Sequence, residues 1–167
     1  MAQNSMAVRA EHQARFVALI EQNRRSMFRV ARAILSCDAD AEDAVSQATL
    51  NAWQAFGRLR DDRAATSWLL KITVNCARDQ FRKGARVTYV EDLAPYAGEA
   101  EAPLISDLWE AVCRLPEDSR ALVTLYYYNG LSIDEVAHVL GIRTGTAKSR
   151  LARARGKLKN MLEEDAP

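Results

Sequence analysis

The chain has 167 residues, a formal net charge of +1, and 49% hydrophobic and 27% charged residues. This composition allows one ordinary domain or two small ones with a buried core, and it excludes a chain that is disordered throughout. Apolar runs fall short of the roughly 20 residues of a membrane-spanning helix, and the polar residues 1–11 lack the apolar core of a signal peptide, so we expect a cytoplasmic protein without direct membrane insertion.

Two helices are predicted at the N-terminus. Apolar residues between Phe16 and Leu35 recur at helical spacings, which predicts a helix over about residues 11–36. Asp38 is a suitable N-cap for a second helix, which runs to about Phe56. The acidic residues in the first turn of this second helix lie where the helix dipole stabilises negative charge.

A third helix and a linker follow. Thr66 is a suitable N-cap for a helix over residues 67–83, and Gly84 is a suitable C-terminal stop. Residues 87–105 contain prolines and acids with little periodicity, which indicates a flexible linker. The β-like stretch at residues 88–90 is too short to compete with this interpretation.

A second helical unit begins near Ser106. Pro116 suits the first turn of a helix that ends near Asn129. Ser132 and Glu135 have the S-x-x-E spacing of a capping box, which predicts that a new helix begins there.

The last two predicted helices have the pattern of a helix-turn-helix. Gly141 ends the first of them after about two turns, and Ile142 can pack between the helices. Thr144 can cap the second, which begins at about Gly145 and extends beyond Lys159. A short helix, a tight turn and a basic helix are typical of DNA-binding proteins in which the second helix enters the major groove.

The charges are segregated along the chain. Bases dominate residues 58–86, acids are the charged residues of 87–108, and bases are those of 143–160. Two basic zones separated by an acidic segment favour two contacts with a polyanion. We therefore predict an all-α fold with two small helical domains, residues 1–86 and 106–167, joined by a flexible acidic linker at residues 87–105, and with the helix-turn-helix in the second domain.

Three segments resemble one known family. Residues 115–162, which contain the run GTAKSRLARAR from Gly145, resemble the promoter-binding C-terminal domain of the extracytoplasmic-function (ECF) group of bacterial sigma factors, in the sigma-70 family. Residues 40–53 resemble the helix by which such factors bind core RNA polymerase, and residues 66–83 resemble the segment that melts and reads the start-proximal promoter element. The resemblance implies an alternative sigma factor that directs transcription initiation at promoters with −35 and −10 elements.

The chain departs from the family pattern at two places. Gln47, Ala48 and Thr49 stand where the family often has Glu-Thr-Phe, and Ala147 stands where valine is common. The first departure concerns the details of polymerase contact, and the second is a small change in the recognition helix.

The resemblance assigns three groups of candidate site residues. Core polymerase binding is assigned to Asp40, Glu42, Asp43, Gln47, Leu50 and Trp53. Start-proximal promoter DNA, including the melted non-template strand, is assigned to Arg58, Arg60, Arg63, Trp68, Lys71, Asn75, Arg78, Gln80, Arg82 and Lys83. Upstream duplex DNA is assigned to Ser132, Arg143, Thr144, Thr146, Ala147, Lys148, Ser149, Arg150 and Arg153. Two alternatives stay open: the acids of the first group also compensate a helix dipole, and Trp68 has the spacing of a core residue.

The expected partners are core RNA polymerase, promoter DNA and, from the resemblance, an anti-sigma factor. A helix-turn-helix regulator that acts without polymerase would explain residues 106–167 but not residues 40–53. A sigma mimic that only sequesters an anti-sigma factor would not need the basic surface. The sequence contains no nucleophile–base pair or phosphate-binding loop, and its three cysteines are far apart with only two histidines, so we expect no enzyme activity, metal or cofactor.

Overall fold

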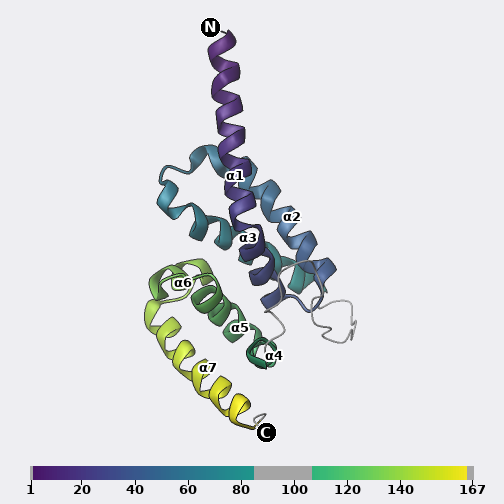
Figure 1. The fold of residues 1–167 in the computed structure, drawn as a ribbon, viewed down its shortest axis with the longest axis vertical. Coiled ribbons are helices and arrows are strands. Elements are labelled where there is room, and N and C mark those ends of the chain that lie inside the picture. Colours follow the sequence, from purple (N-terminus) through teal and green to yellow (C-terminus); the bar gives the residue numbers. More distant parts are fainter. Residues whose placement is uncertain (1, 85–106, 165–167) are drawn as a thin grey trace.

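The computed structural model describes residues 2–84 and 107–164, and every regular element in these two ranges is helical (Figure 1). The predicted all-α class with two helical halves is confirmed. The predicted linker at residues 87–105 and the β-like stretch at residues 88–90 lie outside the described residues.

Three helices form the first half. They are α1 (Ala2–Ile34), α2 (Asp38–Ala55) and α3 (Ala65–Gly84), with short 3-10 helices at Phe56–Arg58 and Asp62–Ala64 between α2 and α3. The buried face of α2 consists of alanines at spacings of three and four, namely Ala41, Ala44, Ala48 and Ala52. Because these side chains are small, α1 and α3 pack close to α2 around one core.

α1 begins well before the predicted start at residue 11. The prediction depended on apolar periodicity, which begins at Phe16, but the residues upstream include alanine, methionine, arginine and glutamate, which are strong helix formers. They extend the helix without a core contact, because Met6 and Val8 are exposed. The start of α1, in purple, therefore projects beyond the other helices (Figure 1).

Both N-caps predicted from residue type in the first half are wrong. The N-cap of α2 is Cys37 and not Asp38, because the Asp38 carboxylate accepts a hydrogen bond from Arg32 Nε at 2.6 Å instead. α3 begins at Ala65, so Thr66 lies inside the helix. The reason is that the 3-10 helix Asp62–Ala64 leads directly into α3 and supplies its first turn.

The second half contains α4 (Asp107–Cys113), α5 (Glu117–Val123), the π-helix η3 (Thr124–Tyr128), α6 (Ile133–Leu140) and α7 (Thr144–Glu164). Pro116 is the N-cap of α5 and not its first residue. The segment predicted as helix up to Asn129 changes to π-helix at Thr124, and the Asn129 N–H donates to the Thr124 carbonyl at 3.1 Å.

The turn of the helix-turn-helix forms much as predicted. Ser132 and Glu135 make both hydrogen bonds of the capping box, and Gly141 ends α6 with a φ of 67°, a conformation that glycine adopts without steric cost. Ile142 packs against the core. Thr144 does not cap α7, because it is the first helical residue and its hydroxyl donates to Asp134 of α6 at 2.9 Å.

The capping box makes a stability prediction. Ser132→Ala should lower the free energy of unfolding by about 1 kcal/mol, because the Glu135 N–H loses its acceptor at the start of α6. Urea unfolding would measure the change. Ser149→Ala is the matched control, since the Ser149 hydroxyl donates to a carbonyl of its own helix and caps nothing. An equal loss in the two variants would contradict a capping role.

The two halves pack directly against each other. One continuous core contains residues of α1, α2 and α3 together with residues of α5, α6 and α7, and α6 lies against α3 (Figure 1). Polar side chains also cross the boundary to backbone carbonyls. Arg120 Nε donates to the Ala33 carbonyl at 2.8 Å, and Arg29 Nη1 donates to the Tyr128 carbonyl at 3.4 Å.

Candidate nucleic-acid interface

The group assigned to polymerase binding lies on α2, and all six side chains are exposed. Two of them are large and apolar: Leu50 is 58% exposed and Trp53 is 43% exposed. Such residues are unusual on the solvent face of a helix whose opposite face already supplies the core. α2 therefore presents an acidic first turn followed by an apolar patch.

The apolar patch continues onto α1, which the sequence prediction missed. The Trp53 ring lies 5.0 Å from the Phe16 ring and 5.6 Å from the His12 ring, measured between centroids. A shallow pocket beside it is lined by Val8, Arg9, His12, Gln13 and Trp53. The available signal was the spacing of four between residues 8, 12 and 16, which places them on one face of α1.

The group assigned to start-proximal DNA contains side chains that are exposed and side chains that contact other parts of the chain. Arg58, Arg60 and Arg63 are exposed on the segment between α2 and α3, and Asn75 and Lys83 are exposed on α3. Several members of the group, exposed or not, make contacts within the chain. Arg63 pairs with Asp61 at 3.2 Å, Arg82 pairs with Asp79, and Gln80 donates to Asp40 at 3.3 Å.

Trp68 packs with the core of the first half. Its ring centroid lies 6.4 Å from that of Phe56, and its side chain is half-buried. The core interpretation is thus the one that its position supports. A stacking platform for a flipped base would need an open ring face.

Arg78 contacts the second half of the chain. Its Nη1 donates to the Leu140 carbonyl at the end of α6, at 3.0 Å. The carboxylates of Glu117 and Asp118, on α5, each lie 3.9 Å from its guanidinium. Arg78 is therefore neutralised in this arrangement and faces the helix-turn-helix.

Asp118 also pairs with α7, the recognition helix of the helix-turn-helix. Asp118 Oδ2 lies 3.3 Å from Arg150 Nη1 of α7, so Asp118 stands between Arg78 and Arg150. Burial, together with the negative charge of Asp118, raises the pKa of Glu117, and its buried Oε1 has no hydrogen-bond partner. Sequence reasoning missed both acids because nothing in the local pattern connects them to α3 or α7.

The exposed side of α7 carries most of the group assigned to upstream DNA. Arg143, Lys148, Ser149 and Arg153 are exposed, while Thr144, Thr146 and Arg150 are half-buried. Ala147, also assigned to DNA, does not face solvent: its side chain is fully buried and packs in the core, because it shares a helix face with Leu151 and Ala154. Ser132 is exposed, and its hydroxyl accepts the capping hydrogen bond.

Comparisons with known proteins match both halves. The family model described as "Sigma-70 region 2" matches residues 19–87, and the model described as "Sigma-70, region 4" matches residues 105–158. The chain is 37% identical over 150 residues to the ECF RNA polymerase sigma factor SigM of Mycobacterium tuberculosis, covering 88% of this chain and 76% of that protein. The chain belongs to the ECF RNA polymerase sigma factors. It thus binds core RNA polymerase and directs transcription initiation.

Further relatives agree with this assignment. The sigma factor is 32% identical to the ECF sigma factor SigL of Mycobacterium tuberculosis, covering 98% of this chain and 97% of that protein. Its structure is similar to that of RpoE from Bartonella quintana in complex with the anti-sigma factor NepR, with a TM-score of 0.78, 26% identity, and coverage of 90% of this chain and 98% of that chain. CnrH in complex with the cytosolic domain of CnrY gives a TM-score of 0.66 at 28% identity, covering 92% of this chain and 91% of that chain. No helix within the described ranges of this sigma factor is long and apolar enough to cross a membrane.

Proposed function

We propose that the two halves of this sigma factor divide the work of initiation. Residues 1–86 bind core polymerase and hold the melted start-proximal element, and residues 106–167 bind the upstream element as duplex. The observation that carries the proposal is the separation of two exposed surfaces: the apolar and acidic face of α2 in one half, and the basic face of α7 in the other. Two linked weak contacts raise each other's effective concentration.

The α2 face supports the polymerase contact. Apolar side chains that are exposed in the free protein and rimmed by charge are typical of a protein interface. Leu50 and Trp53 would provide the buried contact, and Asp40, Glu42 and Asp43 would face basic residues of the polymerase. Exposed acids of this kind contribute mainly to the rate and specificity of association.

The exposed arginines between α2 and α3 support the contact with melted DNA. A single strand is bound by basic side chains along its backbone and by groups that contact the unpaired bases. Arg58 and Arg60 can supply the basic track, and Asn75 can hydrogen-bond a base. Capture of unpaired bases offsets the free energy of melting, so we propose that this chain performs no covalent chemistry and needs no nucleotide cofactor.

We also infer that the two halves separate when promoter DNA is bound. Arg78 and Arg150 belong to groups for different promoter elements, yet both contact Asp118 here. Phosphate groups would have to replace these carboxylate contacts. The relative placement of the halves in Figure 1 is thus proposed to be that of the free protein.

An anti-sigma factor is a further proposed partner. The similar RpoE structure is a complex with the anti-sigma factor NepR, and the similar CnrH structure is a complex with the cytosolic domain of CnrY. We propose that this sigma factor acts in the cytoplasm and is held inactive there by such a protein. Co-purification of the tagged chain with products of neighbouring genes would test this, and failure of all of them to bind would contradict it.

In vitro transcription tests the proposed division of work. Core RNA polymerase with this protein would be supplied with a library of random promoters, and the transcripts sequenced. Specific transcripts from a shared two-part motif are expected. Binding to core without transcripts would instead support a sigma mimic, and absence of core binding would leave a helix-turn-helix regulator that acts without polymerase.

Arg150 makes a specific prediction for the upstream contact. Arg150→Ala should weaken promoter binding by about 1–3 kcal/mol if the side chain reads a base, or reduce the slope of log affinity against log salt by about 1 if it binds a phosphate. Fluorescence anisotropy with a selected promoter would measure both. Arg24→Ala, at an exposed position on α1, is the matched control. If Arg150→Ala changes neither quantity, Arg150 is not in the interface.

A further inference from the structure

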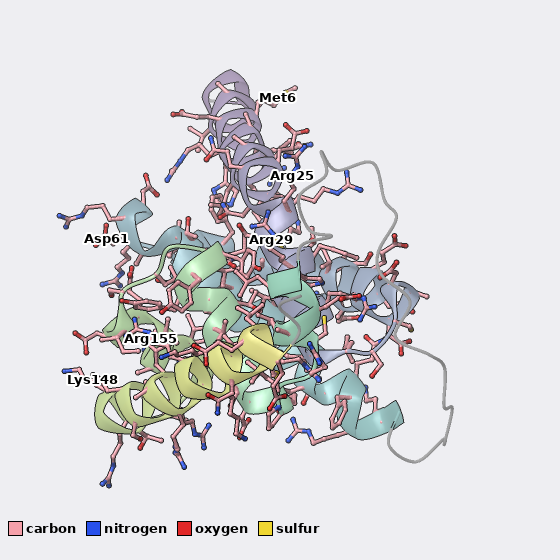
Figure 2. The ribbon with its side chains drawn as sticks, turned by 60° about the horizontal axis from the view of Figure 1, so that its bottom comes forward. Met6, Arg25, Arg29, Asp61, Lys148 and Arg155 are labelled. Atoms are coloured by element: carbon pink, nitrogen blue, oxygen red, sulfur yellow. The ribbon has the colours of Figure 1, made fainter. Side chains whose placement is uncertain are left out.

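Arg155 of α7 lies outside the groups assigned above and has an unusual environment. It is exposed and stands seven residues after Lys148, on the same side of the helix. Both side chains are labelled in Figure 2. The charge of Arg150 is neutralised by Asp118, whereas no carboxylate of the described residues pairs with Arg155.

Two tyrosines of η3 surround the Arg155 guanidinium. Its Cζ lies 5.6 Å from the centroid of the Tyr127 ring and 5.8 Å from that of Tyr126. The two rings are nearly perpendicular to each other, at 85°, with centroids 4.9 Å apart. Arg155 Nε donates a hydrogen bond to Tyr127 Oη. Both tyrosines lie in a π-helix, a conformation that is frequent at functional sites.

These contacts orient the guanidinium and leave its outer edge available. Aromatic rings stabilise a cation over their faces, and the hydrogen bond uses only Nε. The two terminal nitrogens carry further N–H groups, which can make a planar, two-point contact, the geometry in which arginine binds phosphate. Because the side chain is already ordered, binding costs less conformational entropy than for an arginine that is free in solvent.

We propose that Arg155 binds a phosphate of the upstream promoter duplex and that Tyr127 is its positioning residue. The proposal rests on the proposed duplex contact of α7. The recognition residues lie at the start of α7, and Arg155 stands eleven residues after Thr144, which is about 16 Å along the helix axis. At that distance from the groove-inserted end, a side chain meets the flanking backbone and not the base edges.

Three variants of the full chain test the proposal by anisotropy with a 30-base-pair duplex that carries the selected upstream element. Titrations between about 50 and 200 mM salt give the affinity and its salt slope. Arg155→Ala should reduce the affinity severalfold and flatten the slope by about 0.9, the value for one phosphate contact. Tyr127→Phe keeps the ring and removes the hydroxyl, so it should reduce the affinity by about 2- to 10-fold.

The double variant separates positioning from an independent contact. If Tyr127 acts through Arg155, then Tyr127→Phe has no further effect in the Arg155→Ala background. Tyr128→Phe is the matched control, because Tyr128 contacts Arg29 and Trp109 but not Arg155. It should bind the duplex as the wild type does.

Several outcomes would overturn the proposal. One is an Arg155→Ala variant with unchanged affinity and slope; another is a Tyr127→Phe effect that persists without Arg155. Variants that bind DNA normally but bind core polymerase more weakly would place Arg155 at a protein interface instead. Failure of the proposed function is distinguishable, because the wild-type chain itself would then show no salt-dependent binding to the duplex.

Discussion

Replacing Leu50 and Trp53 together with alanine should weaken binding of the sigma factor to core RNA polymerase by about 100-fold or more, equivalent to about 3 kcal/mol. Both side chains are exposed on α2 and form the largest apolar feature of the proposed interface. Large apolar and aromatic residues at the centre of an interface contribute most of its binding free energy, because they are fully desolvated in the complex. Titration of a fluorescently labelled chain with core polymerase would measure the loss.

The single variants make this test specific. Leu50 is the cleaner probe, because more than half of its side chain is exposed in the free protein and its truncation costs the fold little. Trp53 also packs against Phe16 and His12, so thermal unfolding must show that Trp53→Ala is folded. Leu108→Ala is the matched control, since Leu108 is 43% exposed but lies on α4. Equal polymerase affinities for Leu50→Ala and Leu108→Ala would remove Leu50 from the interface.

Magnitudes decide which part of the α2 face dominates affinity. Each exposed carboxylate of α2 can contribute at most about 1 kcal/mol through an ion pair at the rim, and salt screens it. The apolar pair contributes by desolvation, which salt does not weaken. The departure from the family pattern at Gln47 therefore removes a carboxylate whose contribution would be small. The same departure places Thr49 where the family often has phenylalanine, so the proposed apolar contact would depend on Leu50 and Trp53.

The helix-turn-helix was predictable because each local signal agrees with the others. The capping box at Ser132, the glycine with positive φ at position 141 and the apolar face of α6 all indicate the same short helix and turn. Errors arose where a side chain had a tertiary partner. Asp38 and Thr144 are suitable caps by residue type, but their side chains bind Arg32 and Asp134.

The position of Ala147 and the contact between the halves were harder to predict. A small residue in a basic helix fits both a DNA-facing and a core-facing position, and only the packing against α6 decides between them. The polar contacts between the halves join residues far apart in the sequence, and several of them end on backbone carbonyls, which every residue carries. A guanidinium that binds a carbonyl leaves no residue-type signal at the acceptor, so Arg120 could not be matched with Ala33.

Arg120→Ala should lower the free energy of unfolding by about 2–3 kcal/mol. Arg120 joins the two halves: Nε donates to the Ala33 carbonyl of α1 at 2.8 Å, and Nη1 donates to the Leu115 and Cys113 carbonyls at 3.1 and 3.3 Å. Burial lowers the pKa of Arg120, because the guanidinium loses hydration in this place. The three carbonyls accept its hydrogen bonds instead of water. Removal of the side chain leaves acceptors in a partly buried place without a donor.

Urea unfolding of the full chain would measure this loss of stability. Two further variants serve as comparisons. Arg120→Lys keeps the charge but cannot reach three carbonyls with one ammonium group, so it should lose part of the stability. Arg25→Ala, at an exposed position on α1 (Figure 2), should change stability by less than about 0.5 kcal/mol. Because Arg120 connects the halves, its removal should also split the unfolding into two transitions, which a change in the m-value would reveal. If Arg120→Ala unfolds at the same urea concentration as Arg25→Ala, then the apolar core alone holds the halves together. In that case, promoter DNA would have to disrupt this apolar core, as well as the ion pairs of Asp118 with Arg78 and Arg150, when it separates the halves.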